Sequence, residues 1–182
     1  MENKYIQIIL TNGKKINCEL LDSFAPLSTA AFRELVSKHY YDGTIFHRII
    51  SNFMVQTGGY KVENQTLKEL GEAPTIKGEF ASNGFTQNTL HHELGVLSMA
   101  RTNDPNSATS QFFICAAPCD WLDGSYAAFG RVTDEESKQV ILDLSNVETA
   151  RLSPMFADFP CELIGIETIK MGDEGFKQWK NT

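Results

Sequence analysis

The sequence predicts a mainly β protein whose short antiparallel strands form a barrel or a sandwich. Short apolar segments recur along the chain, and turn signals such as Asn12-Gly13 and Asp42-Gly43 separate them. Helical periodicity is confined to Ala25–Val36 and to the segment after Thr133. Periodicity does not choose between a barrel and a sandwich, although a barrel leaves no exposed strand edge.

The chain is predicted to begin with a β-hairpin and a helix. Tyr5–Leu10 is rich in isoleucine, and Asn12-Gly13 is typical of a two-residue turn in which both central residues have positive φ. Apolar and polar residues then alternate from Ile16 to Leu20, as in a half-buried strand. Pro26 suits the first turn of a helix, where its missing N–H breaks no hydrogen bond. The apolar face of this helix is predicted to contain Leu27, Ala31 and Leu35.

The next segment, Phe46–Gly59, is interpreted as a strand. Alternate residues of a strand share a side, so Arg48 would share one with Phe46 and Ile50, and His47 would take a structural role on the other. Taken alone, this segment is a half-buried strand with an outward arginine. Lys61–Gly95 is polar and rich in glycine, which predicts a long excursion with one or two short strands.

The second half of the chain predicts further strands and one helix. One predicted strand, Thr75–Phe80, lies within the polar segment Lys61–Gly95. The strands predicted after that segment are Val96–Ala100, Gln111–Cys115, Tyr126–Val132 and Cys161–Lys170. Thr133 and Glu136 form a capping box that predicts the start of the helix. Its apolar side would contain Val140, Ile141 and Leu144. Trp121–Gly124 reads as a turn, and Lys177–Lys180 as a solvated tail.

The composition is that of an ordinary soluble domain. The 182 residues are 42% hydrophobic and 21% charged, which fits one domain spanning residues 1–182. The net charge of −7 argues against a nucleic-acid surface. No apolar run is long enough to cross a membrane, and Met1–Lys4 shows no secretory leader pattern. We therefore expect a cytoplasmic protein with four reduced thiols, Cys18, Cys115, Cys119 and Cys161.

Two further clusters have simple alternative readings. His91-His92-Glu93 and the pair Cys115 and Cys119 could suggest a metal, but a zinc site requires three or four ligands with supporting partners. We therefore expect no metal and no cofactor. Thr109-Ser110 could belong to a hydrolase, but the surrounding sequence lacks a nucleophile elbow.

Several longer motifs occur in a fixed order along the chain. They are Phe46–Gly59, Gly95–Arg101, Ser107–Ile114, Trp121–Gly124 and Phe129-Gly130. Together they resemble the cyclophilin family of peptidyl-prolyl cis-trans isomerases, and most closely its bacterial cytoplasmic branch. The resemblance covers nearly the whole chain. It implies a closed eight-stranded antiparallel β-barrel with a helix over each open end.

The resemblance also implies roles for individual residues. Arg48 matches the catalytic arginine of the family, and we group Gln56 and Phe53 with it. The walls of the proline pocket would be Phe53, Met54, Phe113 and Leu122. The remaining substrate-binding residues would be Ala100, Arg101, Gln111, Trp121 and Tyr126, with Trp121 at the position linked to cyclosporin binding.

Three residues depart from the family pattern. Arg101 stands where many eukaryotic members have asparagine, so a backbone contact would survive but a side-chain contact would change. Tyr126 replaces a histidine beside the proline pocket and keeps an aromatic wall with a polar tip. Thr57 replaces a glycine. These changes bear on sequence preference and on inhibitor affinity.

The implied chemistry is rotation about the X–Pro peptide bond, which makes and breaks no covalent bond. The barrier of about 18–20 kcal/mol arises from resonance between nitrogen and carbonyl. An arginine that donates a hydrogen bond to the prolyl nitrogen in the twisted state would weaken this resonance. The expected partners are proline-containing peptides, unfolded chains and cyclosporin-type inhibitors, bound by a monomer. A non-catalytic proline-peptide binder and a structural subunit remain the alternative hypotheses.

Overall fold

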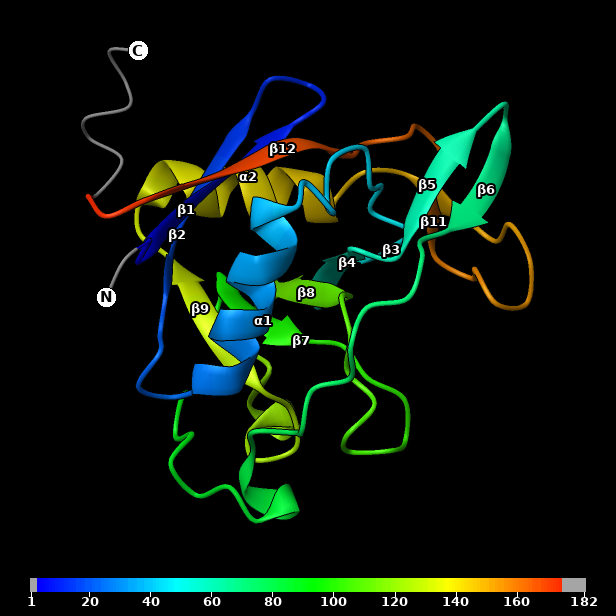
Figure 1. Cartoon of the computed structure of the whole chain (residues 1–182). Coiled ribbons are helices and arrows are strands. Elements are labelled where there is room, and N and C mark those ends of the chain that lie inside the picture. Colours follow the sequence, from blue (N-terminus) through cyan, green and yellow to red (C-terminus); the bar gives the residue numbers. More distant parts are fainter. Residues whose placement is uncertain (1–2, 175–182) are drawn as a thin grey trace.

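The computed structural model describes residues 3–174 and is built on one eight-stranded antiparallel sheet (Figure 1). The predicted tail Lys177–Lys180 lies outside these residues. In spatial order the strands are β12 (Ile166–Gly172), β1 (Tyr5–Leu10), β2 (Lys15–Leu20), β9 (Ala128–Val132), β7 (Val96–Met99), β8 (Phe112–Cys115), β4 (Met54–Thr57) and β3 (Arg48–Ile50).

Two small hairpins, two helices and two 3₁₀ turns complete the described chain. The hairpins pair β5 (Tyr60–Glu63) with β6 (Thr66–Glu69), and β10 (Thr149–Ala150) with β11 (Phe159–Pro160). The helices are α1 (Pro26–Ser37) and α2 (Glu135–Ser145), and the 3₁₀ turns are Ala81–Asn83 and Asp120–Leu122. Helix α1 packs against β9 and β12, whereas α2 packs against β2, β3 and β4. In Figure 1, α1 crosses in front of the sheet and the β5–β6 hairpin projects to the right.

The sheet curls into an open half-barrel, so the expected closed barrel is wrong. Its edge strands are β3 and β12, and the bridge between Ile45 and Gly165 lies just outside both of them. Strand β3 has three residues, and its Ile49 N–H donates to the carbonyl of Asp158 at 3.0 Å. The loop between β10 and β11 therefore occupies the edge that β12 would need for closure.

The main core fills the concave side of the curled sheet. Its centre is an aromatic cluster in which the Phe32 ring of α1 lies 5.3 to 5.4 Å from the rings of Tyr41, Phe112 and Phe129. All four side chains are buried. Helix α1 thus packs against the sheet with Phe32 at the centre of the aromatic cluster.

The buried face of α1 differs from the predicted one. Leu27 is 51% exposed, while Ser28, Phe32 and Leu35 are buried. The carboxylate of Glu79 explains the rotation, because it accepts hydrogen bonds from the Ser28 N–H and hydroxyl and from the Leu27 N–H. A buried acidic group at the helix N-terminus is favoured by the free N–H groups there.

Helix α2 begins one residue later than the capping box predicts. Its N-cap is Asp134, whose carboxylate accepts from the Ser137 N–H at 2.7 Å. Thr133 instead continues the strand pairing, since its N–H donates to the carbonyl of Asn17. The predicted apolar side is present, with Ile141 and Leu144 buried and Val140 packed against the core.

The turn between β1 and β2 was predicted from the sequence, whereas the turn between β3 and β4 was not. The β1–β2 hairpin is confirmed, but four residues separate its strands, and of Asn12 and Gly13 only Gly13 has positive φ (+83°). The segment 46–59 is not one strand: β3 and β4 are joined by a turn in which Asn52 has φ of +62°. Phe46 is buried and Arg48 exposed, so they do not share a side.

Three other strand predictions change in extent. Thr75–Phe80 forms no strand, and only Ile76 makes a bridge, to Ala108. The closing strand begins at Ile166 rather than Cys161. Val96–Ala100, Gln111–Cys115 and Tyr126–Val132 are confirmed as β7, β8 and β9 within two residues at each end.

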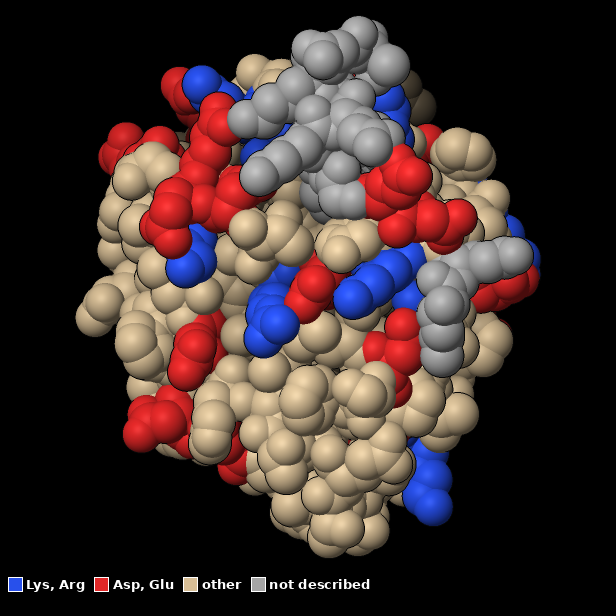
Figure 2. Space-filling model, turned by 90° about the vertical axis from the view of Figure 1, so that its left-hand side faces the viewer, with Lys and Arg blue, Asp and Glu red and all other residues tan. Residues whose placement is uncertain are grey.

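The surface is unevenly charged. Figure 2 shows one face on which Asp and Glu gather along the upper part and the left margin, with Lys and Arg among them. The lower centre of this face carries no charged side chains. Neither helix in the part of the chain described here has the length and apolar character needed to cross a membrane.

Candidate active site

Four neighbouring strands bring a row of functional side chains together. In the strand register, Arg48 of β3 lies opposite Gln56 of β4, and Gln56 lies opposite Phe113 of β8. Phe113 in turn lies opposite Ser98 of β7. Directly opposed residues in a sheet place their side chains on the same face. The row therefore presents a cation, an amide and an aromatic ring side by side.

This row lies on the side of the sheet that faces away from the main core. Along β8, Phe112 and Ile114 point into the core, while Phe113 and Cys115 join a second apolar cluster with Met54. Successive side chains of a strand point to opposite faces. Both faces of these strands are thus buried, which accounts for their continuous apolar sequences.

A pocket of about 120 Å³ opens at this second cluster. Its lining is Arg48, Phe53, Met54, Gln56, Ala100, Arg101, Phe113, Leu122 and Tyr126. All nine belong to the set predicted from sequence. The other two predicted residues adjoin the pocket, since Gln111 is hydrogen-bonded to Gln56 and Trp121 packs against Phe53. The structure brings all eleven together, while their individual roles stay predictions.

A chain of amides orients the polar side of the pocket. Arg48 Nη1 lies 3.4 Å from Gln56 Oε1, a long hydrogen bond that leaves the guanidinium available to other acceptors. The Gln56 Nε2 group donates to Gln111 Oε1 at 2.9 Å. The Gln111 side chain also lies over Gly59, where a Cβ would stand 2.5 Å from its amide nitrogen. Gly59 therefore makes room for Gln111.

Arg101 and Tyr126, two of the residues that differ from the family pattern, are in direct contact. The Arg101 guanidinium lies between two rings, 4.6 Å from the centroid of Tyr126 and 4.9 Å from that of Phe80. It also donates to the carbonyl of Ser125 through Nε and Nη2. Cation–π contacts of this kind hold a planar ring in place. Arg101 thus fixes Tyr126, whose ring packs edge-on against Phe113 at 5.9 Å.

Thr57, the third residue that differs from the family pattern, lies buried in β4. Its hydroxyl donates to the carbonyl of Ile45 at 2.9 Å. Gly58, which follows, has φ of +91°. The glycine needed for the backbone turn is therefore retained one residue later, and Thr57 ties β4 to the segment before β3.

The rim of the pocket is aromatic and open to solvent. Trp121 is 62% exposed, and its ring lies 5.6 Å from that of Phe53. The Phe53 carbonyl accepts from the Ala116 N–H, which holds the β3–β4 turn against the segment after β8. An exposed indole beside an apolar pocket is a common feature of peptide-binding surfaces.

His92, whose ring packs against Phe113, was not identified from the sequence. The buried His92 ring stacks on Phe113 at 6.2 Å, with Nε2 2.8 Å from Ser98 Oγ and Nδ1 2.8 Å from Asp123 Oδ1. Burial lowers the pKa of His92 although the Asp123 carboxylate opposes the shift. The sequence feature that could have indicated this group is Asp123 in the predicted Trp121–Gly124 turn. The Asp123 carboxylate also bonds to His91.

The histidines considered as metal ligands are engaged in this support instead. Within residues 3–174, no group of three His, Cys, Asp or Glu side chains is placed to hold a metal ion. The four cysteines are free thiols, and burial raises the pKa of Cys18 and Cys115.

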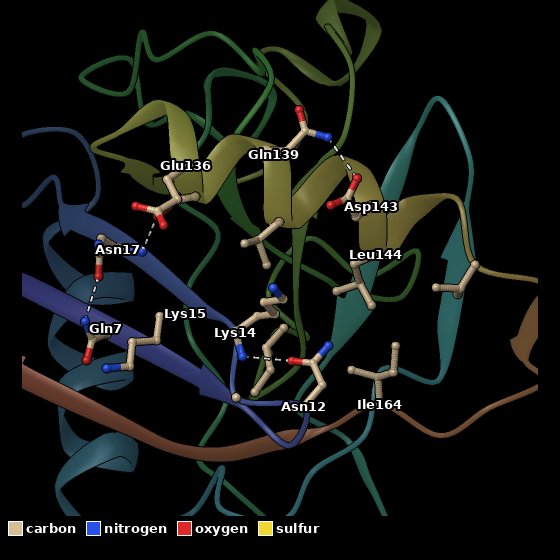
Figure 3. Close-up of a pocket in the computed structure, with 15 residues that line it drawn as sticks. Gln7, Asn12, Lys14, Lys15, Asn17, Glu136, Gln139, Asp143, Leu144 and Ile164 are labelled. Carbon is tan, nitrogen blue, oxygen red and sulfur yellow. Dashed lines mark hydrogen bonds between the residues drawn. The ribbon is translucent and has the colours of Figure 1, made fainter.

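A larger groove lies between α2 and the β1–β2 hairpin, away from the predicted site. It has a volume of about 660 Å³ and contains none of the predicted site residues. Figure 3 shows polar pairs along its walls, in which Gln7 donates to Asn17 and Gln139 donates to Asp143. Asn17 also bonds across to Asp134 and Ser137 at the start of α2, so these polar groups are paired with one another. We therefore place the function at the smaller pocket.

Known proteins share both this sequence and this fold. Residues 5–171 match the model of the cyclophilin-type peptidyl-prolyl cis-trans isomerase family. A peptidyl-prolyl cis-trans isomerase of Acinetobacter baylyi is 43% identical over 145 residues, covering 77% of this chain and 71% of that protein. Peptidyl-prolyl cis-trans isomerase A of Dickeya dadantii is 37% identical over 169 residues, covering 90% and 83%.

Solved structures agree with the sequence relatives. A cyclophilin-type isomerase of Cryptosporidium parvum superimposes with a TM-score of 0.72 at 25% identity, covering 94% of this chain and 98% of that one. A second structure of it, determined in the presence of the dipeptide Ala-Pro, has a TM-score of 0.71 at 26% identity and covers 93% and 99%. The chain belongs to the cyclophilin-type peptidyl-prolyl cis-trans isomerases, enzymes that catalyse rotation about the peptide bond preceding proline.

Proposed function

We propose that Arg48 catalyses this rotation by donating a hydrogen bond to the prolyl nitrogen while the apolar pocket holds the proline ring. The observation that supports this mechanism most directly is the row in which Arg48 is opposite Gln56, and Gln56 is opposite Phe113, with all three lining a pocket of about 120 Å³. The planar amide nitrogen is a poor acceptor, and it gains a lone pair only as the bond twists. The contact thus strengthens in the transition state, as catalysis requires.

The neighbouring amides support this role of Arg48. Because Gln56 Nε2 donates to Gln111, its Oε1 is oriented toward Arg48. This orientation would hold the guanidinium over the pocket, where a charge-assisted hydrogen bond is stronger than in water. Met54, Phe113 and Leu122 are buried and would exclude water from the proline ring.

The peptide backbone would bind along Ala100 and Arg101. The Ala100 N–H is used within the fold, since it donates to the Gln111 carbonyl. Among the described residues, none accepts a hydrogen bond from the Arg101 N–H. This donor can bind a carbonyl of the residues that precede proline. The side chain of Arg101 is engaged with Tyr126, so its contribution to binding would be indirect.

The test is two-dimensional NMR exchange on a short X–Pro peptide with the wild type and Arg48→Ala. We expect kcat/KM to fall about 10²-fold in the variant, which corresponds to ~3 kcal/mol of lost transition-state stabilisation. Peptide binding, measured by chemical-shift titration, should persist because the pocket walls are unchanged.

A matched control is Arg131→Ala. Arg131 is an exposed arginine of β9 paired with Glu19, and it does not line the pocket. Exposed ion pairs contribute little to stability, so this variant should keep wild-type exchange rates. Unchanged catalysis in Arg48→Ala would reject the mechanism, and binding without catalysis by the wild type would leave a proline-recognition module.

The same proposal extends to the biological setting. Residues 1–182 would act as one monomeric isomerase domain in the cytoplasm, on proline-containing peptides and on unfolded chains whose folding waits for X–Pro isomerisation. Cyclosporin-type inhibitors would compete for the pocket beside Trp121. Sedimentation of the free and peptide-bound protein tests the monomer, and competition in the exchange assay tests the inhibitor.

A further inference from the structure

A second cavity opens on the other side of Arg48. It has a volume of about 350 Å³ and shares Arg48 and Gln56 with the proline pocket. The rest of its lining is His47, Tyr60, Met155, Phe156, Ala157 and Asp158. A peptide whose proline occupies the first pocket would therefore reach this cavity within a few residues.

Three of the eight residues that line this cavity are aromatic, and they pack together as one wall. The Tyr60 ring lies edge-on to His47 at 4.8 Å and to Phe156 at 5.0 Å, and the His47 and Phe156 rings are 6.2 Å apart. Met155 is 77% exposed beside them. An exposed methionine next to an aromatic corner can adapt to different apolar side chains.

The fold holds these walls in place from two directions. The Asp158 carbonyl accepts from Ile49 of β3, which anchors the β10–β11 loop that carries Phe156. The Tyr60 carbonyl accepts from Ile45, which anchors the other wall. Phe156 packs further against Phe159 at 5.9 Å. The cavity is thus built from anchored segments rather than from a free loop.

The histidine wall carries no charge near neutral pH. His47 is 6% exposed, and its Nδ1 has no hydrogen-bond partner among the described residues. Burial, and then the Arg48 charge, lower the pKa of His47 to about 4. A neutral ring adds no charge to the wall, so the wall suits an apolar or aromatic occupant better than a charged one.

We propose that this cavity is a subsite for a large apolar or aromatic side chain of the residue that follows proline. The inference rests on the proposed function, in which the residues before proline bind along Ala100 and Arg101. Those residues line the proline pocket but not the second cavity. The peptide residues after proline would therefore pass Arg48 toward His47 and Phe156.

The first experiment uses ¹³C-methyl methionine NMR, because each cavity has its own methionine. Met54 lines the proline pocket and Met155 the second cavity. Acetyl-Ala-Pro-Phe-amide should shift both methyl signals, whereas acetyl-Ala-Pro-Gly-amide should shift only that of Met54. Met155→Leu assigns the signal. Acetyl-Phe-Pro-Gly-amide tests the opposite direction of the chain and should leave Met155 unmoved.

The outcomes separate the subsite from the function on which it rests. A Met54 shift without a Met155 shift for the Ala-Pro-Phe peptide would overturn the subsite and leave the isomerase mechanism intact. A Met155 shift with the Phe-Pro-Gly peptide alone would overturn the assigned direction. If neither signal moved with any peptide, the proposed proline pocket would itself be rejected.

The second experiment measures specificity in the exchange assay. We expect the wild type to turn over the Ala-Pro-Phe peptide with a kcat/KM about tenfold above the Ala-Pro-Gly peptide. Phe156→Ala should lower this ratio to about twofold, and Phe156→Leu should retain most of it. Leu163→Ala removes an apolar side chain that is 50% exposed and lines neither cavity, so it should keep the wild-type ratio. An equal ratio in the wild type and Phe156→Ala would overturn the proposal.

Discussion

His47 shows that the position of a residue in the sequence does not reveal its surroundings in the fold. Its position beside Arg48 suggested a structural role on the opposite strand face. The ring is buried and does not line the pocket of about 120 Å³. Its contacts with the Tyr60 and Phe156 rings come from segments far apart in the chain. A local pattern carries no information about such contacts, so the second cavity could not be predicted from the sequence.

The buried His47 should make stability depend on pH. Its pKa is 6.5 in an unfolded chain and about 4 in the fold, so only the unfolded state binds the proton between these values. The free energy of unfolding should therefore fall as the pH drops from about 6.5 to about 4, by on the order of 3 kcal/mol in total. Above this window, the residue should contribute no pH dependence.

Urea denaturation across this pH range checks the expectation. In His47→Gln the slope between pH 6.5 and pH 4 should be reduced, because the group that titrates is gone. His39→Gln serves as the control, since the His39 side chain is largely exposed and bonds only to Asp42 within the described chain. Parallel pH profiles for the wild type and His47→Gln would show that the ring does not remain neutral in the fold.

The residues that line the pocket of about 120 Å³ were predicted from the family resemblance, whose motifs are local stretches of sequence. Phe53, Met54 and Gln56 lie within four residues of sequence, and the β3–β4 turn places them on one surface. The contact between Arg101 and Tyr126 was not predictable, because it requires the β7 and β9 ends to meet. The two substitutions were read as independent departures, whereas the structure couples them.

At the scale of elements, the sequence predicted the positions of the two helices better than the first residue of α2 or the buried face of α1. The capping box placed the start of α2 at Thr133, but Thr133 still pairs with β2 and Asp134 takes the cap. The apolar spacing of α1 included Leu27, but the Glu79 carboxylate binds the Ser28 backbone and turns Leu27 outward. Both errors arise from tertiary contacts that override local preference.

The cap of α2 can be tested by comparing the two candidate residues. Asp134→Ala removes the acceptor of the Ser137 N–H and of the Asn17 side-chain amide, and should lower the free energy of unfolding by about 1–2 kcal/mol. Thr133→Ala removes only a hydroxyl bonded at 3.3 Å to the Asn17 carbonyl, so its effect should stay below about 0.5 kcal/mol. Chemical denaturation of both variants decides between them, and a larger loss for Thr133→Ala would restore the capping box.

At the scale of the whole molecule, the difference between a closed barrel and the observed half-barrel depends on one edge. Strand periodicity predicted a curved antiparallel sheet but contained no information on how its edges meet. The edge at β3 is covered by the β10–β11 loop through the Ile49–Asp158 hydrogen bond. That loop also carries Phe156, so the feature that leaves the sheet open also forms the cavity beside Arg48.

An open sheet depends on its helices to fill the concave side. Phe32 is the residue of α1 whose ring contacts Tyr41, Phe112 and Phe129 together, so it links the helix to the whole aromatic cluster. Phe32→Ala should therefore create a cavity at the centre of the core and lower the free energy of unfolding by about 3–5 kcal/mol. Leu27→Ala, on the same helix but half-exposed, should cost less than about 1 kcal/mol. Urea denaturation measures both, and similar losses would mean that α1 stabilises the half-barrel through its whole surface rather than through this one ring.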